Sequence, residues 1–198
     1  MKIYLTSIAS SVLEKIVPEL PKKPSEMKVA FIPTAADTYG ADNRPWLDAD
    51  RAKFVELGFQ LEDFDLKNKT EDEVRAALSK SDIIFVAGGN TFYLLEKIKQ
   101  SGFDKVLREL KASEKIYIGS SAGSIIVGPN IEPLKSLNHS EEANLDNYDA
   151  IGLVDFVVLP HWGKEKYAAK QEAVIKEFGK KYKLKPIKDG EMVNSSPH

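Results

Sequence analysis

Two serines stand between glycines in the stretch YIGSSAGS, directly after a run of β-forming residues. Ser121 is the centre of a Gly-x-Ser-x-Gly motif bounded by Gly119 and Gly123. Such a serine can occupy a tight turn between a strand and a helix, where its hydroxyl projects out of the sheet and the glycines tolerate the crowded backbone. The motif also arises by chance as a small-residue turn. Its place after an expected strand and before an expected helix favours a nucleophile.

A serine hydroxyl is a weak nucleophile without a general base, and the chain contains three histidines. His161 follows DFVVLP and is expected at the carboxyl end of a strand, like Ser121. His139 lies in an irregular segment, and His198 is the last residue, where chains are poorly fixed. A histidine at a strand end can also be a simple polar exit residue. Because ligands gather beyond the carboxyl ends of parallel strands, we favour Ser121 and His161 as nucleophile and base.

A third motif of this kind, VAGGNTFYLL, places Gly88 and Gly89 after another apolar run. Asn90 or Thr91 would cap the helix that follows. The glycines can serve a turn with positive φ, or they can let backbone N–H groups approach a ligand. We favour an oxyanion hole made by the amides of Gly89 and Ala122. Neither GxxxxGK[ST] nor GxGxxG is present, so a phosphate loop is not expected.

The elements that must position these motifs alternate along the chain. Short apolar runs typical of buried strands alternate with amphipathic segments typical of helices, which predicts βαβ units and a mainly parallel sheet covered on both faces. Thr70 and Glu73 form a capping box, and Gly58 and Gly102 stand where helix C-terminal caps belong. Strands are expected at 1–7, 28–36, 60–66, 82–89, 115–121 and 155–162, helices at 46–59, 70–81, 90–102, 103–114, 122–128 and 165–182, and a strand-turn-strand at 185–194.

The least regular region is residues 129–152, between the serine and histidine motifs. Loops of this length in a compact domain are usually functional. No internal repeat, low-complexity tract or composition shift marks a domain boundary. We therefore expect a single domain over residues 1–198.

The composition excludes several classes of function. The 198 residues carry a net charge of -2, so the basic excess typical of a general nucleic-acid-binding surface is absent. The chain has no cysteine, which excludes disulfides, thiolate zinc sites and a cysteine nucleophile. No cluster of histidines and carboxylates has metal-ligand spacing, and we expect neither a metal nor a cofactor.

No stretch of 18 apolar residues occurs, and charged residues interrupt the apolar N-terminal segment. We therefore expect a cytoplasmic protein without a membrane partner. No exposed apolar face stands out by pattern, so the sequence leaves a monomer and a homodimer equally open.

The segments AGGNTFYLL, YIGSSAGS and VVLPHW, in this order and spacing, resemble the peptidase E family of serine peptidases. That family includes aspartyl dipeptidases and, more distantly, cyanophycinases, and the resemblance extends from FIPTAA to DGEMV. It implies a three-layer α/β/α fold similar to class I glutamine amidotransferases, which is flavodoxin-like, with serine in place of their cysteine. It also implies that Ser121 is the nucleophile, His161 the base, and the Gly89 and Ala122 amides the oxyanion donors.

The resemblance implies a third acid near the C-terminus, a carboxylate followed by glycine. Asp189 in KDGEM matches it best, although glutamate is expected there in the dipeptidase. Glu191 would point the same way on a strand and ranks second, followed by Asp146 and Asp149. Asp-Gly is also a common hairpin turn, so Asp189 can equally be a turn residue only.

This chain departs from the aspartyl dipeptidase at two places. Ser120 precedes the nucleophile where that enzyme has a bulky aromatic residue, and Lys135 and Ser136 stand where a carboxylate-containing run would handle the substrate amino terminus. These departures leave aspartyl-dipeptide specificity open.

Three further residues are candidates for substrate binding. Arg44 could pair with a substrate carboxylate, Trp162 could form a wall of the site beside His161, and Asn90 follows the expected oxyanion loop. Each residue can instead have a purely structural role: Arg44 can be solvated, Trp162 can pack in the core, and Asn90 can cap a helix.

Together these features predict a serine-type peptidase that hydrolyses short peptides, dipeptidase-like, with or without a preference for aspartyl-X, through an acyl-enzyme on Ser121. An esterase of the α/β-hydrolase type is one alternative, although no HGGG-like motif occurs and the acid would follow the histidine. The other is a non-catalytic relative that binds a small ligand.

Overall fold

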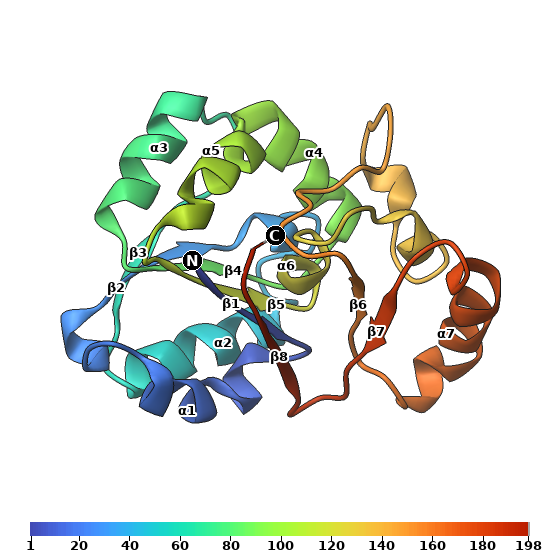
Figure 1. Ribbon diagram of the computed structural model, residues 1–198, viewed down its shortest axis with the longest axis horizontal. Helices are drawn as coiled ribbons and strands as arrows, with labels where there is room; N and C mark the ends of the chain where they lie inside the picture. Colours follow the sequence, from blue (N-terminus) through green and yellow to red (C-terminus); the bar gives the residue numbers. More distant parts are fainter. Residues whose placement is uncertain (198) are drawn as a thin grey trace.

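The central sheet of the computed structural model, which describes residues 1–197, has six strands in the order β3-β2-β4-β5-β1-β8 (Figure 1). Five strands run parallel, and β8 joins the edge antiparallel to β1. A second sheet pairs β6 with β7 in parallel. The strands are β1 Lys2–Thr6, β2 Lys28–Ile32, β3 Gln60–Asp63, β4 Ile83–Val86, β5 Ile116–Ser120, β6 Val157–Leu159, β7 Leu184–Pro186 and β8 Met192–Ser195.

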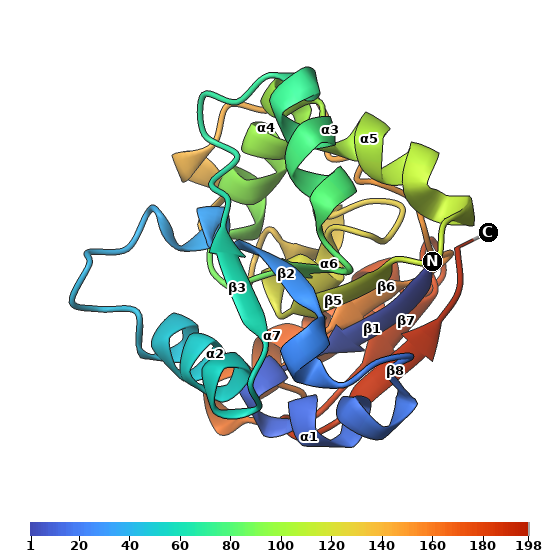
Figure 2. The same ribbon diagram turned by 90° about the vertical axis from the view of Figure 1, so that its left-hand side faces the viewer.

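Helices cover both faces of this sheet, as Figures 1 and 2 show. The helices α1 (Leu13–Ile16) and α2 (Pro45–Glu56) lie on one face. The helices α3 (Glu71–Lys80), α4 (Thr91–Ser101) and α5 (Phe103–Glu109) lie on the other. Alternate strand residues supply the two cores because successive side chains of a strand point to opposite faces. The predicted three-layer α/β/α fold is confirmed.

The helix ends follow the local signals of the sequence. The Thr70 hydroxyl accepts from the Glu73 amide, and the Glu73 carboxylate accepts from the Thr70 amide, which completes the expected capping box at α3. Gly102 ends α4 with φ 71°, and Gly58 follows α2 with φ 89°. No helix in residues 1–197 combines the length and the apolar character needed to cross a membrane.

A third group of elements lies beside the main sheet: β6, β7, α7 (Glu165–Phe178) and the segment 129–152 (Figure 1). Its own apolar cluster joins them to α4 and to the short helix α6 (Ala122–Ile125). Within 129–152, two single turns of 3₁₀ helix and a bridge between Asn130 and Asp149 are the only regular structure described.

The structure corrects the expected strand pairing at two places. The strand predicted at 155–162 is short and lies in a second sheet, not in the one main sheet that was expected. The two strands predicted within 185–194 form, but they do not pair with each other, because β7 joins β6 and β8 joins β1. The turn at Asp189 and Gly190 therefore links the two sheets rather than closing a hairpin.

Candidate active site

Ser121 occupies the turn between β5 and α6 with a strained backbone, φ 47° and ψ -104°. Its amide donates to the Thr6 carbonyl at 3.0 Å, which ties the turn to the neighbouring strand β1. A serine in this conformation presents its hydroxyl beyond the carboxyl end of the sheet.

The glycines of the motif are required by close packing of backbone. A Cβ built on Gly119 would lie 2.5 Å from the Gly123 carbonyl oxygen, and one on Gly123 would lie 2.0 Å from the Val86 carbonyl oxygen. No real Cβ comes this close to a backbone oxygen, so α6 can approach β4 and β5 only without side chains here. That approach holds the strained turn of Ser121 in place.

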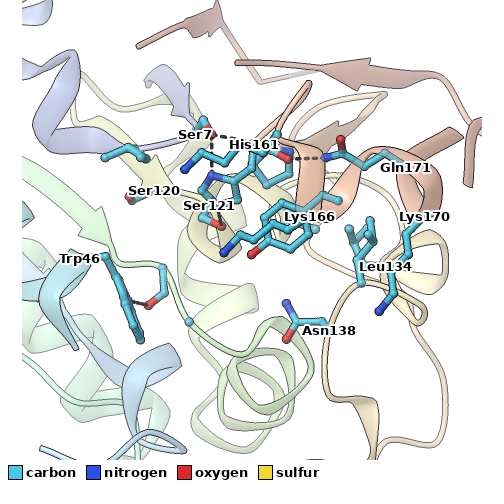
Figure 3. A pocket seen from close by; sticks show the side chains of 18 of the residues that line it. Ser7, Trp46, Ser120, Ser121, Leu134, Asn138, His161, Lys166, Lys170 and Gln171 are labelled. Atoms are coloured by element: carbon cyan, nitrogen blue, oxygen red, sulfur yellow. Dashed lines mark hydrogen bonds between the residues drawn. The ribbon is translucent and has the colours of Figure 1, made fainter. Parts of the chain in front are cut away.

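His161 follows β6 and also has a positive φ, 60°. Its Nε2 lies 3.2 Å from Ser121 Oγ, and its Nδ1 lies 2.8 Å from Asp189 Oδ1. The His161 ring stacks on Tyr167 of α7, with 5.7 Å between ring centroids. The structure therefore brings together the three residues expected as nucleophile, base and acid, although Ser121 and His161 follow strands of different sheets. Figure 3 shows Ser121 and His161 side by side in the site.

Ser7 is a member of this group that the sequence reasoning missed. Its hydroxyl donates to Asp189 Oδ1 at 2.6 Å and accepts from the His161 amide at 2.8 Å. Ser7 therefore fixes the acid and the backbone of the base at once. Its place directly after β1 is the sequence signal that could have revealed Ser7 as a site residue. The strand β1 pairs with β5, so the carboxyl ends of the two strands lie side by side.

The second oxygen of Asp189 is held by Lys164, whose Nζ lies 2.5 Å from Oδ2. Burial alone would raise the pKa of Asp189, but hydrogen bonds from Lys164, Ser7 and His161 outweigh it and lower the pKa to about 2. Burial lowers the pKa of His161 below its usual 6.5, and the Asp189 carboxylate offsets this only in part. At neutral pH, Asp189 is thus ionised and His161 is a neutral base.

These shifts predict the acid limb of a pH–rate profile. Protonated His161 cannot accept the Ser121 proton, so kcat/KM should fall as pH drops through the lowered pKa, with a midpoint below 6.5.

Lys164→Met removes a cation near the ring and frees Asp189, so the pKa of His161 should rise and the midpoint should move to higher pH. Kinetics between pH 4 and 9 measure this, with Lys176→Met on the exposed side of α7 as the control. An unmoved midpoint would contradict the assignment of the limb to His161.

Glu191, the second-ranked acid, does not contact His161. Its carboxylate accepts from the Lys188 amide at 2.8 Å and closes the turn before β8. The expectation that it shares a strand face with Asp189 is wrong, since β8 begins only at Met192. The two lower-ranked acids are also apart from His161, since Asp149 accepts from the Asn130 side chain and Asp146 makes no contact with His161. His198 lies outside the described residues.

The segment with Gly88 and Gly89 packs directly against the candidate nucleophile. A Cβ on Gly88 would lie 3.3 Å from Ser121 Cβ, and one on Gly89 would lie 2.0 Å from the Ala35 carbonyl oxygen. Within residues 1–197, neither the Gly89 nor the Ala122 amide donates a hydrogen bond. Gly89 lines the cavity described next, and Ala122 is fully buried.

Ser121 and His161 line a cavity of about 620 Å³ (Figure 3). Small-molecule sites span roughly 300–1,000 Å³, so the volume suits a small ligand. Three further groups of side chains contribute to the lining. They are Trp46 and Asp50 from α2, then Leu134, Leu137, Asn138 and His139 from the segment 129–152, and Lys166, Tyr167, Lys170 and Gln171 from α7.

The three expected substrate-binding residues do not line this cavity. Asn90 is fully buried, where it caps α4 through the Phe92 and Tyr93 amides and donates to the carbonyl of His139 in the segment 129–152. Arg44 lies outside the cavity as the residue before α2, and the Trp162 amide bonds to the Ile187 carbonyl. Trp46, two residues after Arg44, forms the wall instead and donates to the Gly88 carbonyl at 3.2 Å.

The model of peptidase family S51 matches residues 5–196. A protein of Listeria monocytogenes named an uncharacterized peptidase is 36% identical over 166 residues, which cover 83% of this chain and 80% of that protein. An uncharacterized peptidase of Pasteurella multocida is 29% identical over 187 residues, 94% of this chain and 89% of its own. A peptidase E of Shewanella amazonensis is 38% identical over a shorter stretch, 44% of this chain and 36% of that protein.

Solved structures agree with these sequence matches. A crystal structure of a Listeria monocytogenes protein provisionally assigned to peptidase E superposes with a TM-score of 0.87 at 31% identity, covering 100% of this chain and 98% of that one. A peptidase from an acI-B1 actinobacterium shares the fold, with a TM-score of 0.71 at 16% identity over 98% of this chain and 83% of that one. The chain thus belongs to peptidase family S51 and is a peptidase.

Proposed function

We propose that this protein is a serine-type peptidase that hydrolyses short peptides, dipeptides above all, through an acyl-enzyme on Ser121. The observation that carries the proposal is the chain of contacts from Ser121 Oγ to His161 Nε2 and from His161 Nδ1 to Asp189 Oδ1, at 3.2 and 2.8 Å. This is the arrangement of nucleophile, base and orienting acid that activates a serine hydroxyl.

In the first half of the reaction, Ser121 Oγ bonds to the scissile carbonyl carbon while His161 Nε2 takes the hydroxyl proton. The ionised Asp189 stabilises the imidazolium, and the free Gly89 and Ala122 amides donate to the oxyanion. When the tetrahedral intermediate collapses, the C–N bond breaks and the amine leaves with the proton from His161.

In the second half, His161 takes a proton from water as the water oxygen bonds to the acyl carbon. The ester bond to Ser121 then breaks, and His161 returns the proton to Ser121 Oγ. The acyl product leaves as a carboxylate, an amino acid in the case of a dipeptide, and the free enzyme is restored. Water is the co-reactant that balances these steps.

The preference for very short peptides rests on the shape and charge of the cavity. The segment 129–152 and α7 both contribute to its lining. We infer that they restrict the passage of an extended chain. Lys166 and Lys170 of α7 line it as well, and Lys170 has no ion-pair partner within residues 1–197. The leaving group of a dipeptide is a free amino acid, and these lysines can bind its carboxylate.

A matched panel of substrates tests this proposal. The panel holds dipeptides X-Y, including Asp-X and Glu-X, the corresponding C-terminal amides, tripeptides and simple esters, with products read by mass spectrometry. We expect free dipeptides to be cleaved fastest, their amides at least tenfold more slowly, and tripeptides slower still. Faster turnover of esters with no dipeptide cleavage would favour the esterase, and turnover of no member would favour the non-catalytic relative.

A further inference from the structure

Asp50 is a buried carboxylate for which the catalytic steps provide no role. It lies on α2, is only 1% exposed, and lines the cavity. Its Oδ1 accepts from the Ser10 amide at 2.7 Å, whereas its Oδ2 has no hydrogen-bond partner within residues 1–197. A buried carboxylate oxygen without a partner is costly, because the group loses water and gains nothing in return.

The surroundings of Asp50 join it to the candidate nucleophile. Burial raises the pKa of Asp50, and the hydrogen bond from the Ser10 amide acts against that shift. The preceding amide, that of Ala9, donates to the hydroxyl of Ser120 at 3.2 Å, so one turn holds both Asp50 and the residue before the nucleophile. A Cβ on Gly88 would lie 3.5 Å from the Ser120 carbonyl oxygen and 3.7 Å from Trp46. Asp50, Ser120, Gly88 and Trp46 therefore form one continuous wall, which we call the α2 wall.

The charges of the cavity are divided between two sides. Figure 3 shows Trp46 and Ser120 of the α2 wall on one side of Ser121, and Lys166, Lys170 and Gln171 of α7 on the other. All of the lysines that line the cavity come from residues 164–170, whereas the buried carboxylate belongs to the α2 wall. A ligand that spans the cavity thus meets an anion at one end and cations at the other.

The chemistry of the proposed reaction fixes which part of the substrate lies on each side. His161 must protonate the leaving amine, so the leaving residue lies on the side of His161 and the lysines. The acyl residue then lies on the opposite side, along the α2 wall. In a dipeptide, the acyl residue carries the free α-ammonium group, and a lysine or arginine side chain would add a second cation.

Building on the proposed function, we propose that Asp50 is the specificity-determining residue of the acyl subsite and binds a cationic group of the acyl residue through its free oxygen. The ligand chemistry is an ammonium or guanidinium group, from the substrate amino terminus or from a basic side chain. Pairing with such a group satisfies Oδ2 and compensates the burial of the charge. Ser120 contributes because its small side chain leaves the carboxylate within reach of the cavity.

The test compares Asp50→Asn with Asp48→Asn, an exposed carboxylate on the same helix. Asparagine keeps the shape and an oxygen for the Ser10 amide, so it removes the charge with little change in packing, which thermal unfolding verifies. Three substrates separate the sources of the cation: Ala-Leu with only the α-ammonium, N-formyl-Ala-Leu with none, and N-acetyl-Lys-Leu with only the side-chain cation.

Hydrogen bonds to charged groups are typically worth factors of about 10 to 100. We therefore expect Asp50→Asn to lower kcat/KM for Ala-Leu, N-acetyl-Lys-Leu or both by about that factor relative to Asp48→Asn, and to change N-formyl-Ala-Leu less than threefold. The substrate that loses most identifies the source of the cation. An equal loss on all three substrates, or no loss on any, would overturn the proposal.

Binding to the Ser121→Ala protein separates this inference from the proposed function. Calorimetry with Ala-Leu and N-acetyl-Lys-Leu is performed with and without Asp50→Asn in that background. A loss of affinity of about tenfold or more on removing Asp50 supports the cation subsite even if the wild type hydrolyses nothing. Equal affinity of the two proteins, or no binding to either, overturns it.

Discussion

Ser121→Ala is expected to lower kcat/KM for the best dipeptide by a factor of about 10⁴ to 10⁶, as removal of a serine nucleophile does in other triad enzymes. The alanine leaves His161 and Asp189 in place but removes the only hydroxyl within reach of His161 Nε2 in the described chain. The nearby buried hydroxyl of Ser124 cannot replace it, because it is bonded to the Thr6 and Gly119 carbonyls.

The measurement is dipeptide hydrolysis at matched protein concentration, with Ser79→Ala on α3 as a control for contaminating peptidases from the expression host. Among the residues that the structure describes, the Ser79 hydroxyl bonds only to the Ala76 carbonyl of its own helix, so this variant should match the wild type. A Ser121→Ala protein that retains more than a tenth of the activity would show that another group attacks the carbonyl.

The second large effect is expected at the acid. Asp189→Asn should lower kcat/KM by roughly 10³- to 10⁴-fold, the loss seen when the orienting aspartate of a triad becomes asparagine. The variant removes the charge that stabilises the imidazolium and leaves the Lys164 ammonium beside the ring without its partner. Both changes disfavour proton transfer from Ser121 to His161.

Glu191→Gln is the matched control, since the sequence left these two acids open and they lie two residues apart. Within residues 1–197 its side chain accepts only from the Lys188 amide, so we expect kcat/KM within about threefold of the wild type. Both variants are assayed from pH 5 to 9, so that activity lost through a shifted pKa of His161 is distinguished from activity lost through removal of the acid. Similar losses in the two variants, or a larger loss in Glu191→Gln, would contradict the placement of the acid at Asp189.

Local sequence patterns were sufficient to predict most helices and strands and to select Ser121 and His161, the nucleophile and the base. Capping signals, apolar runs and the glycines of the serine motif depend on neighbours in sequence, and the structure has most of these elements where the patterns predict. The strand expected over 28–36 ends at Ile32 and is followed by a 3₁₀ turn, and the short helix α1 was not predicted. Ser121 and His161 both follow strands, so the expectation that polar residues at strand ends gather was useful. It succeeded for His161 although β6 lies outside the main sheet, because β6 and the loop after it pack against that end of the molecule.

Residues whose role depends on sheet order or distant packing could not be predicted in this way. Ser7 meets Asp189 only because β1 lies between β5 and β8, and no local pattern gives that order. Asp50 lies among acidic and basic residues that suggest an exposed face. Its spacing from the buried Leu47 and Phe54, three and four residues, does place it on the buried side of α2, which is the signal that would have revealed it.

Labelling by a fluorophosphonate tests the central claim, that Ser121 is an activated nucleophile, without reference to any substrate. The intact protein is treated with the probe, and the modified residue is located by peptide mass spectrometry in the wild type, in His161→Ala and in Ser121→Ala. We expect one adduct, on Ser121, formed at least a hundredfold more slowly in His161→Ala and absent from Ser121→Ala. An adduct on a different residue, or labelling of Ser121 that is equally fast without His161, would contradict the account.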